Sequence, residues 1–391
     1  MNDLKIFTQN IEPDALNQIY SLLNQSSFSN EKIRIMPDVH SGAGCLVGFT
    51  STMKDKIIPN LIGVDIGCGM LTCELGKMEI DLPKLDLFIK QNIPSGSEYL
   101  REVDGEDIIN GLLCKNKLNN MERLWGSLGT LGGGNHFIEI DEDDEQNKYL
   151  IIHSGSRNLG LQVAKIYQNI AIKNCKEVAF EEREQLISRL KAENKIDEIP
   201  DELKKISEKY AYKTKIPKEL CYLDGFDMQA YLHDIKLCQE FASKNRVKIA
   251  KKIIKFLKIN KYSQFETIHN FISNGIIRKG AVPAYKGQKI LIPMNMRDGC
   301  LICEGLGNDD WNCSAPHGAG RLISRGDAKK ILDVKEYQLS MSGIYTTTAN
   351  QSTIDEAPMV YKPMQEIMDL ISPTVKILKT IKPIYNYKAS E

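Results

Sequence analysis

Short loops of small residues, each presenting a chemically active side chain, are the feature that most restricts how this chain can fold. Glycine adopts backbone conformations that other residues resist, and it lets the backbone approach a ligand closely. Short apolar and β-branched runs lead into these loops, which is typical of strands that end in glycine turns. The sequence therefore predicts β-sheets whose strand ends carry a functional site. The loops are MPDVHSGAG (36–44), VDIGCGM (64–70), GGGNHFIEI (132–140), HSGSRNLG (153–160) and APHGAGR (315–321).

The chain alternates between strand-like and helix-like composition. Early strands are predicted at 44–52, 61–67, 70–75 and 148–156. Between 161 and 258 the apolar residues recur at helical spacing among mixed charges, and strand character returns near 265. We expect an α+β fold in which glycine-rich β-sheets form the core and carry the site loops, with helices outside. The block 161–258 is interpreted as a helical insertion within one domain spanning 1–391, and a separate domain is the alternative.

Composition excludes few functions, but it favours one cellular compartment over others. The 391 residues contain 51 Lys plus Arg and 51 Asp plus Glu, so net charge indicates no partner, and a local basic groove could still bind nucleic acid. No apolar run approaches the roughly 18 residues of a membrane span, and MNDLKIFTQNIEPD lacks the apolar segment of a secretory signal. We therefore expect a cytoplasmic protein with reduced thiols. The CxxC pair, Cys300 and Cys303, is expected to be structural.

Residues in three of the loops form a candidate metal-binding set. A thiolate, imidazoles and a carboxylate together suit a borderline divalent ion such as Mn, Zn, Co or Ni. The alternative is that Cys68 is a small buried residue and that Asp65 caps a turn. The recurrence of such loops in one chain favours the metal site. Its predicted ligands are Asp65, Cys68, His136 and His153.

Other loop residues suit phosphate binding or nucleophilic chemistry. The glycines of GTLGGGN offer successive backbone N–H groups to an anion. Arg157 and Arg321 could bind phosphate or form structural salt bridges. His317 follows Pro316 on a rigid, open loop, where a histidine can be a metal ligand, an acid or base, or a nucleophile. The residue types alone leave these roles open.

The remaining histidines differ in context. His233 lies in the helical pattern AYLHDIKL and is expected to be an ordinary helix residue. His40 follows Asp38 by two positions, which suits an oriented imidazole. His269, in TIHNFI, is compatible with a structural or a functional role.

Seven motifs, in this order along the chain, resemble those of the RtcB family of RNA-splicing ligases: MPDVHSGAG, IPNLIGVDIGCGM, GSLGTLGGGNHFIEI, HSGSRNLG, IRKGAVPA, HGAGRLISR and IDEAPMVYK. The resemblance runs from about residue 30 to the C-terminus. It implies an RtcB-like fold and a GTP- and Mn-dependent ligase that joins RNA 2′,3′-cyclic phosphate or 3′-phosphate ends to 5′-hydroxyl ends, in RNA repair or tRNA splicing. The implied partners are GTP, broken RNA such as tRNA halves, and an archease-like activator. A monomer that does not engage membranes is expected.

The resemblance also implies roles for individual residues. His317 takes GMP from the α-phosphate of GTP and passes it to the RNA 3′-phosphate, and the 5′-hydroxyl attacks the resulting RNA-3′-ppG end. Asp65, Cys68 and His136 hold one manganese ion, and Cys68 bridges to a second ion that His153 also binds. The nucleotide is expected to contact Asn135, Glu139, Ser314, Gly318, Ala319, Gly320, Tyr361 and Lys388. Phosphate or RNA is expected to contact Arg157, Arg278, Lys279 and Arg321.

Two stretches depart from the family pattern. Family members usually carry a metal-binding histidine directly before RKGA, where this chain has Ile277, so the second metal site is expected to lack a ligand. The loop IPMNMRDG has Met294 and Asn295 where the family usually has PGSMG beside the nucleotide. These departures keep three other functions open: a 2′,3′-cyclic phosphodiesterase, a ligase of DNA 3′-phosphate ends, and a non-catalytic protein that binds RNA ends.

Overall fold

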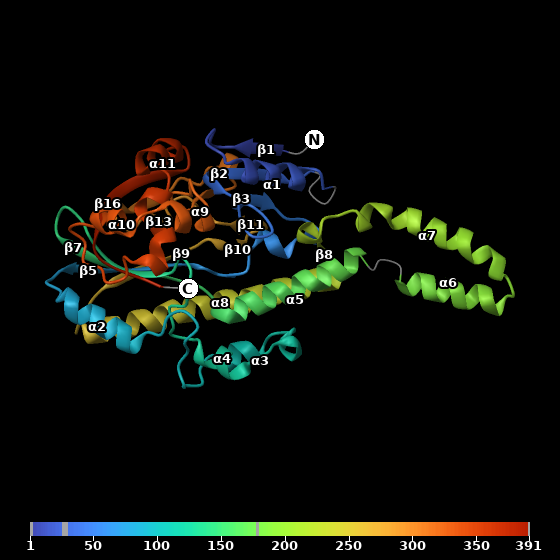
Figure 1. Ribbon diagram of the computed structural model, residues 1–391, viewed down its shortest axis with the longest axis horizontal. Coiled ribbons are helices and arrows are strands. Elements are labelled where there is room, and N and C mark those ends of the chain that lie inside the picture. Colours follow the sequence, from blue (N-terminus) through green and yellow to red (C-terminus); the bar gives the residue numbers. More distant parts are fainter. Residues whose placement is uncertain (1–2, 26–29, 177–179, 390–391) are drawn as a thin grey trace.

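A seven-stranded antiparallel sheet dominates the computed structural model, which describes residues 3–25, 30–176 and 180–389 (Figure 1). Its two edge strands approach each other, and the backbone N–H of Leu291 donates to Thr267 Oγ1 at 3.0 Å. The sheet is therefore nearly closed, so its inner face encloses side chains. In spatial order the strands are β13 (Lys289–Asn295), β14 (Gly299–Gly305), β16 (Val375–Lys388), β6 (Phe137–Glu142), β7 (Asn147–Ser154), β5 (Gly69–Lys77) and β9 (Ser263–Ile268).

A five-stranded sheet carries the first site loop. Its order is β1 (Asp3–Ile6), β2 (Lys32–His40), β3 (Val47–Thr52), β11 (Ile276–Lys279) and β10 (Asn270–Ser273). The register of β2 against β3 is irregular between Ile35 and His40, and such irregularities re-aim side chains near functional sites. Two further ribbons pair β12 (Ala281–Pro283) with β15 (Ser314–Pro316), and β4 (Lys56–Ile57) with β8 (Leu223–Asp224).

Helices pack against the main sheet or project from it. The α-helices are α1 (Pro13–Leu23), α2 (Leu82–Asn92), α3 (Glu106–Asn110), α4 (Met121–Gly126), α5 (Arg157–Lys176), α6 (Phe180–Ala192), α7 (Ile199–Thr214), α8 (Gly225–Phe256), α9 (Arg325–Ile331), α10 (Val334–Ser340) and α11 (Met364–Ile371). The 3-10 helices are η2 (Pro59–Leu61), η3 (Lys115–Lys117), η4 (Ile196–Glu198), η5 (Lys218–Leu220), η6 (Asp309–Trp311), η7 (Gln351–Glu356) and η8 (Pro358–Val360). None of the described helices combines the length and apolar composition that crossing a bilayer requires.

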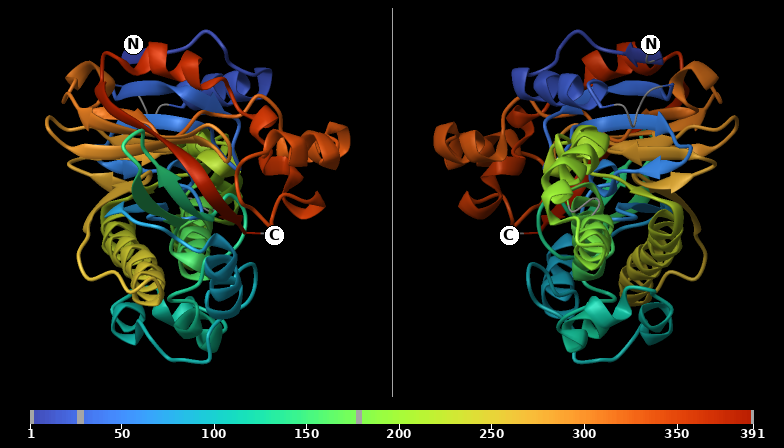
Figure 2. Two further views of the ribbon diagram at one scale, coloured as in Figure 1. Left: turned by 90° about the vertical axis from the view of Figure 1, so that its left-hand side faces the viewer. Right: turned by 90° about the vertical axis from the view of Figure 1, so that its right-hand side faces the viewer.

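The helices of the block 161–258 differ in their surroundings. The long helix α8 packs against β5 and β7, and α5 runs alongside it (Figure 1). In contrast, α6 and α7 pack on each other and project away from the sheets as a helical hairpin. At another side of the molecule, α9 and α10 form a small lobe (Figure 2). Within the described part of this block, the α6–α7 hairpin is therefore the segment that projects from the body of the protein. That the whole block 161–258 is an insertion within one domain stays a prediction.

The strands of the main sheet bury both of their faces. Ile138 and Ile140 of β6 point toward an apolar cluster shared with α2 and the second half of α8. Phe137, on the opposite face, joins an inner cluster with Met70 and Ile151. Because side chains alternate along a strand, positions 139 and 141 follow Phe137 to the inner face. The main apolar core lies elsewhere, between the five-stranded sheet, α1, α5 and the first half of α8.

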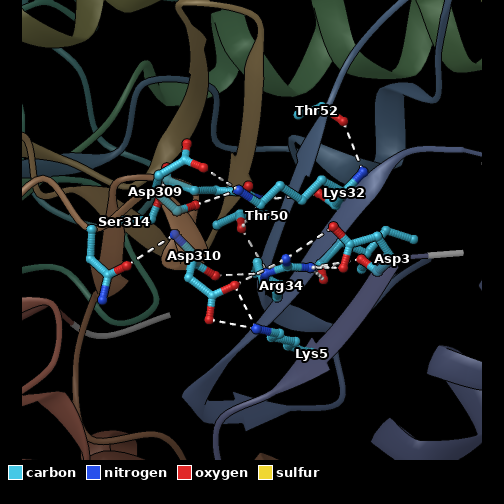
Figure 3. A network of polar contacts seen from close by, with 12 residues as sticks. Asp3, Lys5, Lys32, Arg34, Thr50, Thr52, Asp309, Asp310 and Ser314 are labelled. Carbon is cyan, nitrogen blue, oxygen red and sulfur yellow. Dashed lines mark hydrogen bonds and ion pairs between the residues drawn. The ribbon is translucent and has the colours of Figure 1, made fainter.

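A network of charged residues ties the N-terminal strands to the segment that leads into β15 (Figure 3). Arg34, on β2, is fully buried and donates to the carbonyl of Asp310 at 2.6 Å. Its guanidinium also pairs with the carboxylates of Asp3 and Asp310. Lys5, on β1, reaches Asp310 at 2.7 Å. The network therefore anchors η6, which precedes β15 and the loop of His317.

The predicted α+β architecture is confirmed, with one local error. The segment 61–67 is predicted to be a strand, but it forms the end of η2 and a turn. The isoleucines and leucine there are buried against helices rather than paired in a ladder, so apolar content alone is misleading at this point. Residues 228–256, whose apolar spacing fits one long helix or two in series, lie within the single helix α8.

Candidate active site

Asp65 and Cys68 lie on a tight turn between η2 and β5. The backbone N–H of Cys68 donates to the carbonyl of Asp65 at 3.2 Å. Asp65 Oδ1 accepts from the backbone N–H of Ser156 at 3.0 Å. A Cβ at Gly155 would collide with the Asp65 carboxylate and displace it, so glycine at this position leaves the carboxylate in place. The turn therefore fixes a carboxylate and a thiol beside the loop that follows β7.

His136 and His153 come from neighbouring strands of the main sheet. His136 directly precedes β6, and Phe137 is paired in register with His153 near the end of β7. The two imidazole centroids therefore lie only 5.2 Å apart. His153 Nδ1 donates to the carbonyl of Asn135 at 3.1 Å. The lone pair of Nε2 is therefore available to a metal ion. On the opposite edge of the His136 ring from Asp65, Arg157 Nη1 lies 3.0 Å from His136 Nδ1.

Two groups of possible metal ligands share Cys68. One group is Asp65, Cys68 and His136, and the other is Cys68, His153 and His269. Within each group the ligand atoms lie within 4.8 Å of one another. Cys68 Sγ lies 3.4 Å from His136 Nε2 and 3.3 Å from His153 Nε2. His153 Nε2 lies 3.5 Å from His269 Nε2. A thiol between two ligand groups is the arrangement that a bridging thiolate needs.

His269 corrects the expectation about Ile277. Ile277 is 1% exposed and packs in the main apolar core, so it does not occupy a ligand position. His269 lies between β9 and β10, and its backbone N–H donates to the carbonyl of Cys68 at 2.9 Å. Its Nδ1 is buried with no hydrogen-bond partner among the described residues. The second group therefore has a histidine whose role the sequence leaves undecided.

Burial controls the protonation of these groups. Burial lowers the pKa of His136, His153 and His269, which keeps the imidazoles neutral, as metal ligands must be. Burial also raises the pKa of the Cys68 thiol, and the neighbouring Asp65 carboxylate raises it further. Burial alone would raise the pKa of Asp65, but its hydrogen bond with His136 and the positive charge of Arg157 hold it well below its usual range. A bound cation would favour the Cys68 thiolate.

His317 is held by a buried carboxylate. Asp38 Oδ2 accepts from His317 Nδ1 at 2.7 Å and from the His317 backbone N–H at 3.0 Å. This contact keeps the ring proton on Nδ1 and leaves Nε2 free to attack an electrophile. The His317 ring centroid lies 4.9 Å from that of His269 and 6.4 Å from that of His40. Burial lowers the pKa of His40 to about 4, so its imidazole is neutral near pH 7.

A cavity of about 800 Å³ opens beside His317. Its volume lies within the range of small-molecule sites. Glu356 lines it and forms ion pairs with Lys388 at 2.7 Å and with Arg325 at 2.6 Å. Burial alone would raise the pKa of Glu356, but these cations and Arg321 hold it well below its usual range. The predicted site residues that line this cavity are Asn135, Glu139, His153, His317, Gly318, Ala319, Gly320, Arg321, Tyr361 and Lys388. Met294 and Asn295 of the departing loop line it as well.

Three predicted contact residues do not face the cavity. Lys279 Nζ donates to the backbone carbonyls of Ala43, Cys45 and Asn60, which uses all three of its protons. Arg278 is fully buried, and its Nε donates to Ser314 Oγ at 2.9 Å. Ser314 is also fully buried beneath the His317 loop. Internal hydrogen bonding therefore accounts for the side chains of Arg278, Lys279 and Ser314, and their contact with nucleotide or RNA stays a prediction.

A smaller cavity of about 300 Å³ lies on the other side of the ligand groups. Asp65, Asn135 and His136 line it together with Arg123 and Arg157. Asn135 also lines the larger cavity, so the metal-ligand groups lie between two spaces. The smaller cavity offers guanidinium groups next to a possible metal position, which suits an oxyanion.

Comparison with known proteins decides the family. A family model described as "tRNA-splicing ligase RtcB" matches residues 21–111 and 110–389. The chain belongs to the RtcB family. It is 28% identical to the RNA-splicing ligase RtcB of Escherichia coli K12, over 97% of this chain and 96% of that protein. It is 26% identical to the tRNA-splicing ligase RtcB of Aeropyrum pernix, over 85% of this chain and 82% of that protein.

Two features of the RtcB site in this chain escape prediction from the sequence. The spacing of Asp38 and His40 in MPDVH predicts that the aspartate orients His40. In the structure, however, the Asp38 side chain binds His317. No local signal indicates that contact, which spans 279 positions. The role of His269 is undecided in the sequence because no glycine loop surrounds it. The sequence feature that could have indicated its role is the dipeptide His269-Asn270, which leads into the strand pair β10–β11.

Proposed function

We propose that this protein is a GTP-dependent RNA ligase that joins 2′,3′-cyclic phosphate or 3′-phosphate ends to 5′-hydroxyl ends through a guanylylated His317. The observation that carries the proposal is the setting of His317. Its Nδ1 is bound by Asp38, its ring is close to His269, and it lines a cavity large enough for a nucleotide. The relatives named RNA-splicing ligases support the same class of reaction.

The residues of the two ligand groups fit a borderline divalent ion. Neutral imidazoles, a carboxylate and a thiol that can lose its proton are ligands that manganese accepts. Asp65, Cys68 and His136 would hold one ion, and Cys68, His153 and His269 would hold the other. A divalent ion at these positions supplies charge neutralisation to phosphate oxygens.

Three transfers follow from this arrangement. His317 Nε2 bonds to the α-phosphorus of GTP while the bond to the leaving pyrophosphate breaks. The ring keeps its Nδ1 proton, and Asp38 stabilises the positive charge that the ring gains. An oxygen of the RNA 3′-phosphate then displaces His317 and takes the GMP. Finally, the 5′-hydroxyl oxygen loses its proton, bonds to the 3′-phosphorus and releases GMP. A cyclic end must first be opened by water.

The two cavities divide the substrates between them. The backbone of Gly318 to Gly320 can follow the phosphate of the nucleotide, and Arg321 lies next to it. Glu139 and Lys388 offer an acceptor and a donor to the base, and the Tyr361 ring lies at the same end. Arg157, in the smaller cavity, is suited to the terminal phosphate of the RNA.

The direct test uses GTP labelled at the α-phosphate. Incubation with Mn²⁺ should leave acid-labile label on the wild-type protein and none on His317→Ala. His233→Ala is the matched control, because that histidine is exposed on α8 and contacts only the carbonyl of Gly111 among the contacts described for its side chain. Absence of a His317-dependent adduct across Mn²⁺, Co²⁺ and Zn²⁺ would refute the proposal.

The alternative functions separate in a second assay. Label that transfers to RNA 3′-phosphate and disappears as RNA is sealed to a 5′-hydroxyl strand supports the RNA ligase. Sealing of DNA but not RNA ends favours the DNA ligase, and opening of cyclic ends without sealing favours the phosphodiesterase. Binding of RNA ends without any chemistry favours the end-binding protein. The presence of His269 in the second ligand group removes the main reason to expect hydrolysis without sealing.

A further inference from the structure

We propose that Asp141 is a positioning residue for base recognition: it shares a proton with Glu139 on the inner face of the main sheet, and so couples guanine binding to pH. The inference rests on the proposed function, because it assumes that guanine occupies the larger cavity. It concerns a residue that does not itself line that cavity.

The two carboxyls lie side by side in apolar surroundings. Glu139 and Asp141 are alternate residues of β6 and point to the same face, with exposed fractions of 2% and 0%. Ile151 is paired in register with Glu139, and the inner cluster of Met70, Leu291, Cys300 and Ile381 fills the same face. Water therefore cannot stabilise two negative charges there.

Their oxygens lack donors. Glu139 Oε2 accepts from Asn386 Nδ2 at 3.0 Å. Glu139 Oε1 and both carboxylate oxygens of Asp141 are buried without a hydrogen-bond partner among the described residues. Two ionised carboxylates offer each other no proton, whereas one protonated carboxyl can donate to its neighbour. The pair therefore holds at least one proton, and that proton makes the missing hydrogen bond.

Neighbouring cations do not neutralise the pair. On β16, the positive charge of Lys388 acts on Glu139, but its Nζ is already paired with Glu356 at 2.7 Å. On β13, Lys289 is paired with Glu74 of β5. Each of these ammonium groups therefore already has a carboxylate of its own.

The uncharged neighbours do not supply the missing donors either. On β7, Tyr149 donates its hydroxyl proton to Asp143. On β14, Cys300 offers only a weak S–H donor to Asp141, and burial raises the pKa of Cys300. On β5, the buried hydroxyl of Thr72 contacts neither carboxyl among the described hydrogen bonds. The residues of β5 and β13 that join the inner cluster are apolar.

The titration that results lies near neutral pH. Burial raises the pKa of Asp141 to about 7. Burial and the Asp141 charge raise the pKa of Glu139 well above its usual range. Because the groups interact strongly, they lose protons in two steps that belong to the pair. Below about pH 7 both carboxyls are protonated, and above it one proton remains between them.

Guanine recognition requires the singly ionised pair. Guanine presents N1–H and N2–H₂ donors on one edge, and an ionised carboxylate of Glu139 can accept both. Guanine binding draws the remaining proton of the pair onto Asp141, which donates it to Glu139 Oε1 while Asn386 Nδ2 donates to Oε2, so the carboxylate plane is fixed. When both carboxyls are protonated, Glu139 presents a hydroxyl donor to a guanine donor. GMP binding at low pH must therefore expel a proton.

The test measures GMP affinity of the Mn²⁺-loaded protein at pH 6 and pH 8. For a group of pKa near 7, the ionised fraction rises about tenfold over this interval, so wild-type affinity should rise about tenfold beyond the change seen with AMP. AMP serves as reference because it has the same phosphate. Asp141→Asn supplies a permanent amide donor to Glu139, so its affinity should be nearly equal at both pH values. Asp143→Asn, the same change two residues further along the chain, should keep the wild-type ratio.

A calorimetric measurement on the wild-type protein keeps the test independent of how the variant folds. In two buffers of different ionisation enthalpy, GMP binding at pH 6 should release close to one proton more than AMP binding. Release of no extra proton, or equal pH dependence in wild type and Asp141→Asn, would overturn the inference while GMP still bound. Failure of GMP to bind at either pH would instead overturn the proposed function and the inference with it.

Discussion

At the scale of single residues, the contact between Asp38 and His317 determines which nitrogen of the imidazole is nucleophilic. The 2.7 Å hydrogen bond from Nδ1 fixes one tautomer, and the second hydrogen bond from the His317 backbone fixes the carboxylate. Asp38 is completely buried, so its charge is poorly screened. A carboxylate in this position both orients the ring and stabilises the cation formed during attack.

Replacing Asp38 by Asn should therefore impair guanylylation without removing the nucleophile. The amide can donate to Nδ1 and stabilise the wrong tautomer, and we expect the rate of His317 labelling to fall about 10²- to 10⁴-fold. Single-turnover labelling with α-labelled GTP measures this rate. An Asp38→Asn variant that melts normally and labels at the wild-type rate would contradict the assigned role of Asp38.

Metal content should distinguish His269 from Ile277. His269→Ala removes a ligand from the second group, and we expect the protein to lose about one Mn²⁺ per chain at limiting metal concentration. Ile277→His should gain no ion, because the side chain lies in the apolar core, and should lower the free energy of unfolding by about 2 kcal/mol or more. Elemental analysis and denaturant unfolding measure both effects. A gain of metal in Ile277→His would contradict the structure.

The residues that sequence could predict share one property: glycine or another small residue surrounds them. Asp65, Cys68, His136 and His153 lie on such loops, and the structure brings these four side chains together. Arginine and lysine beside glycine were less informative. A cation next to a loop can turn inward and satisfy backbone carbonyls, as Lys279 does, and sequence contains no sign of that direction.

At the scale of elements, α8 supports the site from behind. Asn245 Oδ1 accepts from the backbone N–H of Gly129 at 2.6 Å, which holds the loop that precedes His136. Arg246 Nη1 donates to the carbonyls of Gly67 and Ser154, at 2.8 and 2.6 Å. One helix therefore holds the loops that carry the ligands on β5, β6 and β7.

Replacing Arg246 by Met should loosen these loops. The change removes the guanidinium that donates to two buried carbonyls and to Glu266 Oε1, and we expect a loss of about 3–5 kcal/mol in unfolding free energy. Displacement of supporting contacts should also weaken Mn²⁺ affinity about 10- to 100-fold. Urea unfolding and metal titration provide the measurements. Lys244→Ala, on the exposed face of α8, should change stability by no more than about 0.5 kcal/mol. Equal effects of the two changes would contradict the buttressing role.

Helical periodicity predicts that α8 exists but not what it does. Asn245 and Arg246 are fully buried polar residues, yet in sequence they read as part of a charged helix face. The function of Arg246 depends on the carbonyls of Gly67 and Ser154, which lie 179 and 92 positions away from it. The prediction of a strand at 61–67 is wrong for a related reason. Long-range packing and the Asp65–Cys68 turn override the local preference of these apolar residues for a strand.

At the scale of the whole molecule, the α6–α7 hairpin is separate from the site. Among its described residues, Leu186, Leu190 and Ile206 pack on one another, and Glu182 pairs with Lys209 within the hairpin. The chain leaves and returns at one place, because Lys176 Nζ donates to the carbonyl of Ile216. The hairpin projects away from the sheets (Figure 1).

The hairpin should therefore be removable without loss of the chemistry. A linker of about four Gly and Ser residues spans up to about 13 Å, which is enough to join residue 176 to residue 216 where they meet. We expect Mn²⁺ content and His317 labelling to stay within about twofold of wild type, because no site contact crosses the junction among the described residues. Far-UV circular dichroism should show the lost helix. A tenfold fall in labelling with retained metal would mean that the hairpin takes part in nucleotide binding, whereas loss of metal would mean that it supports α5 and the Asp65 turn.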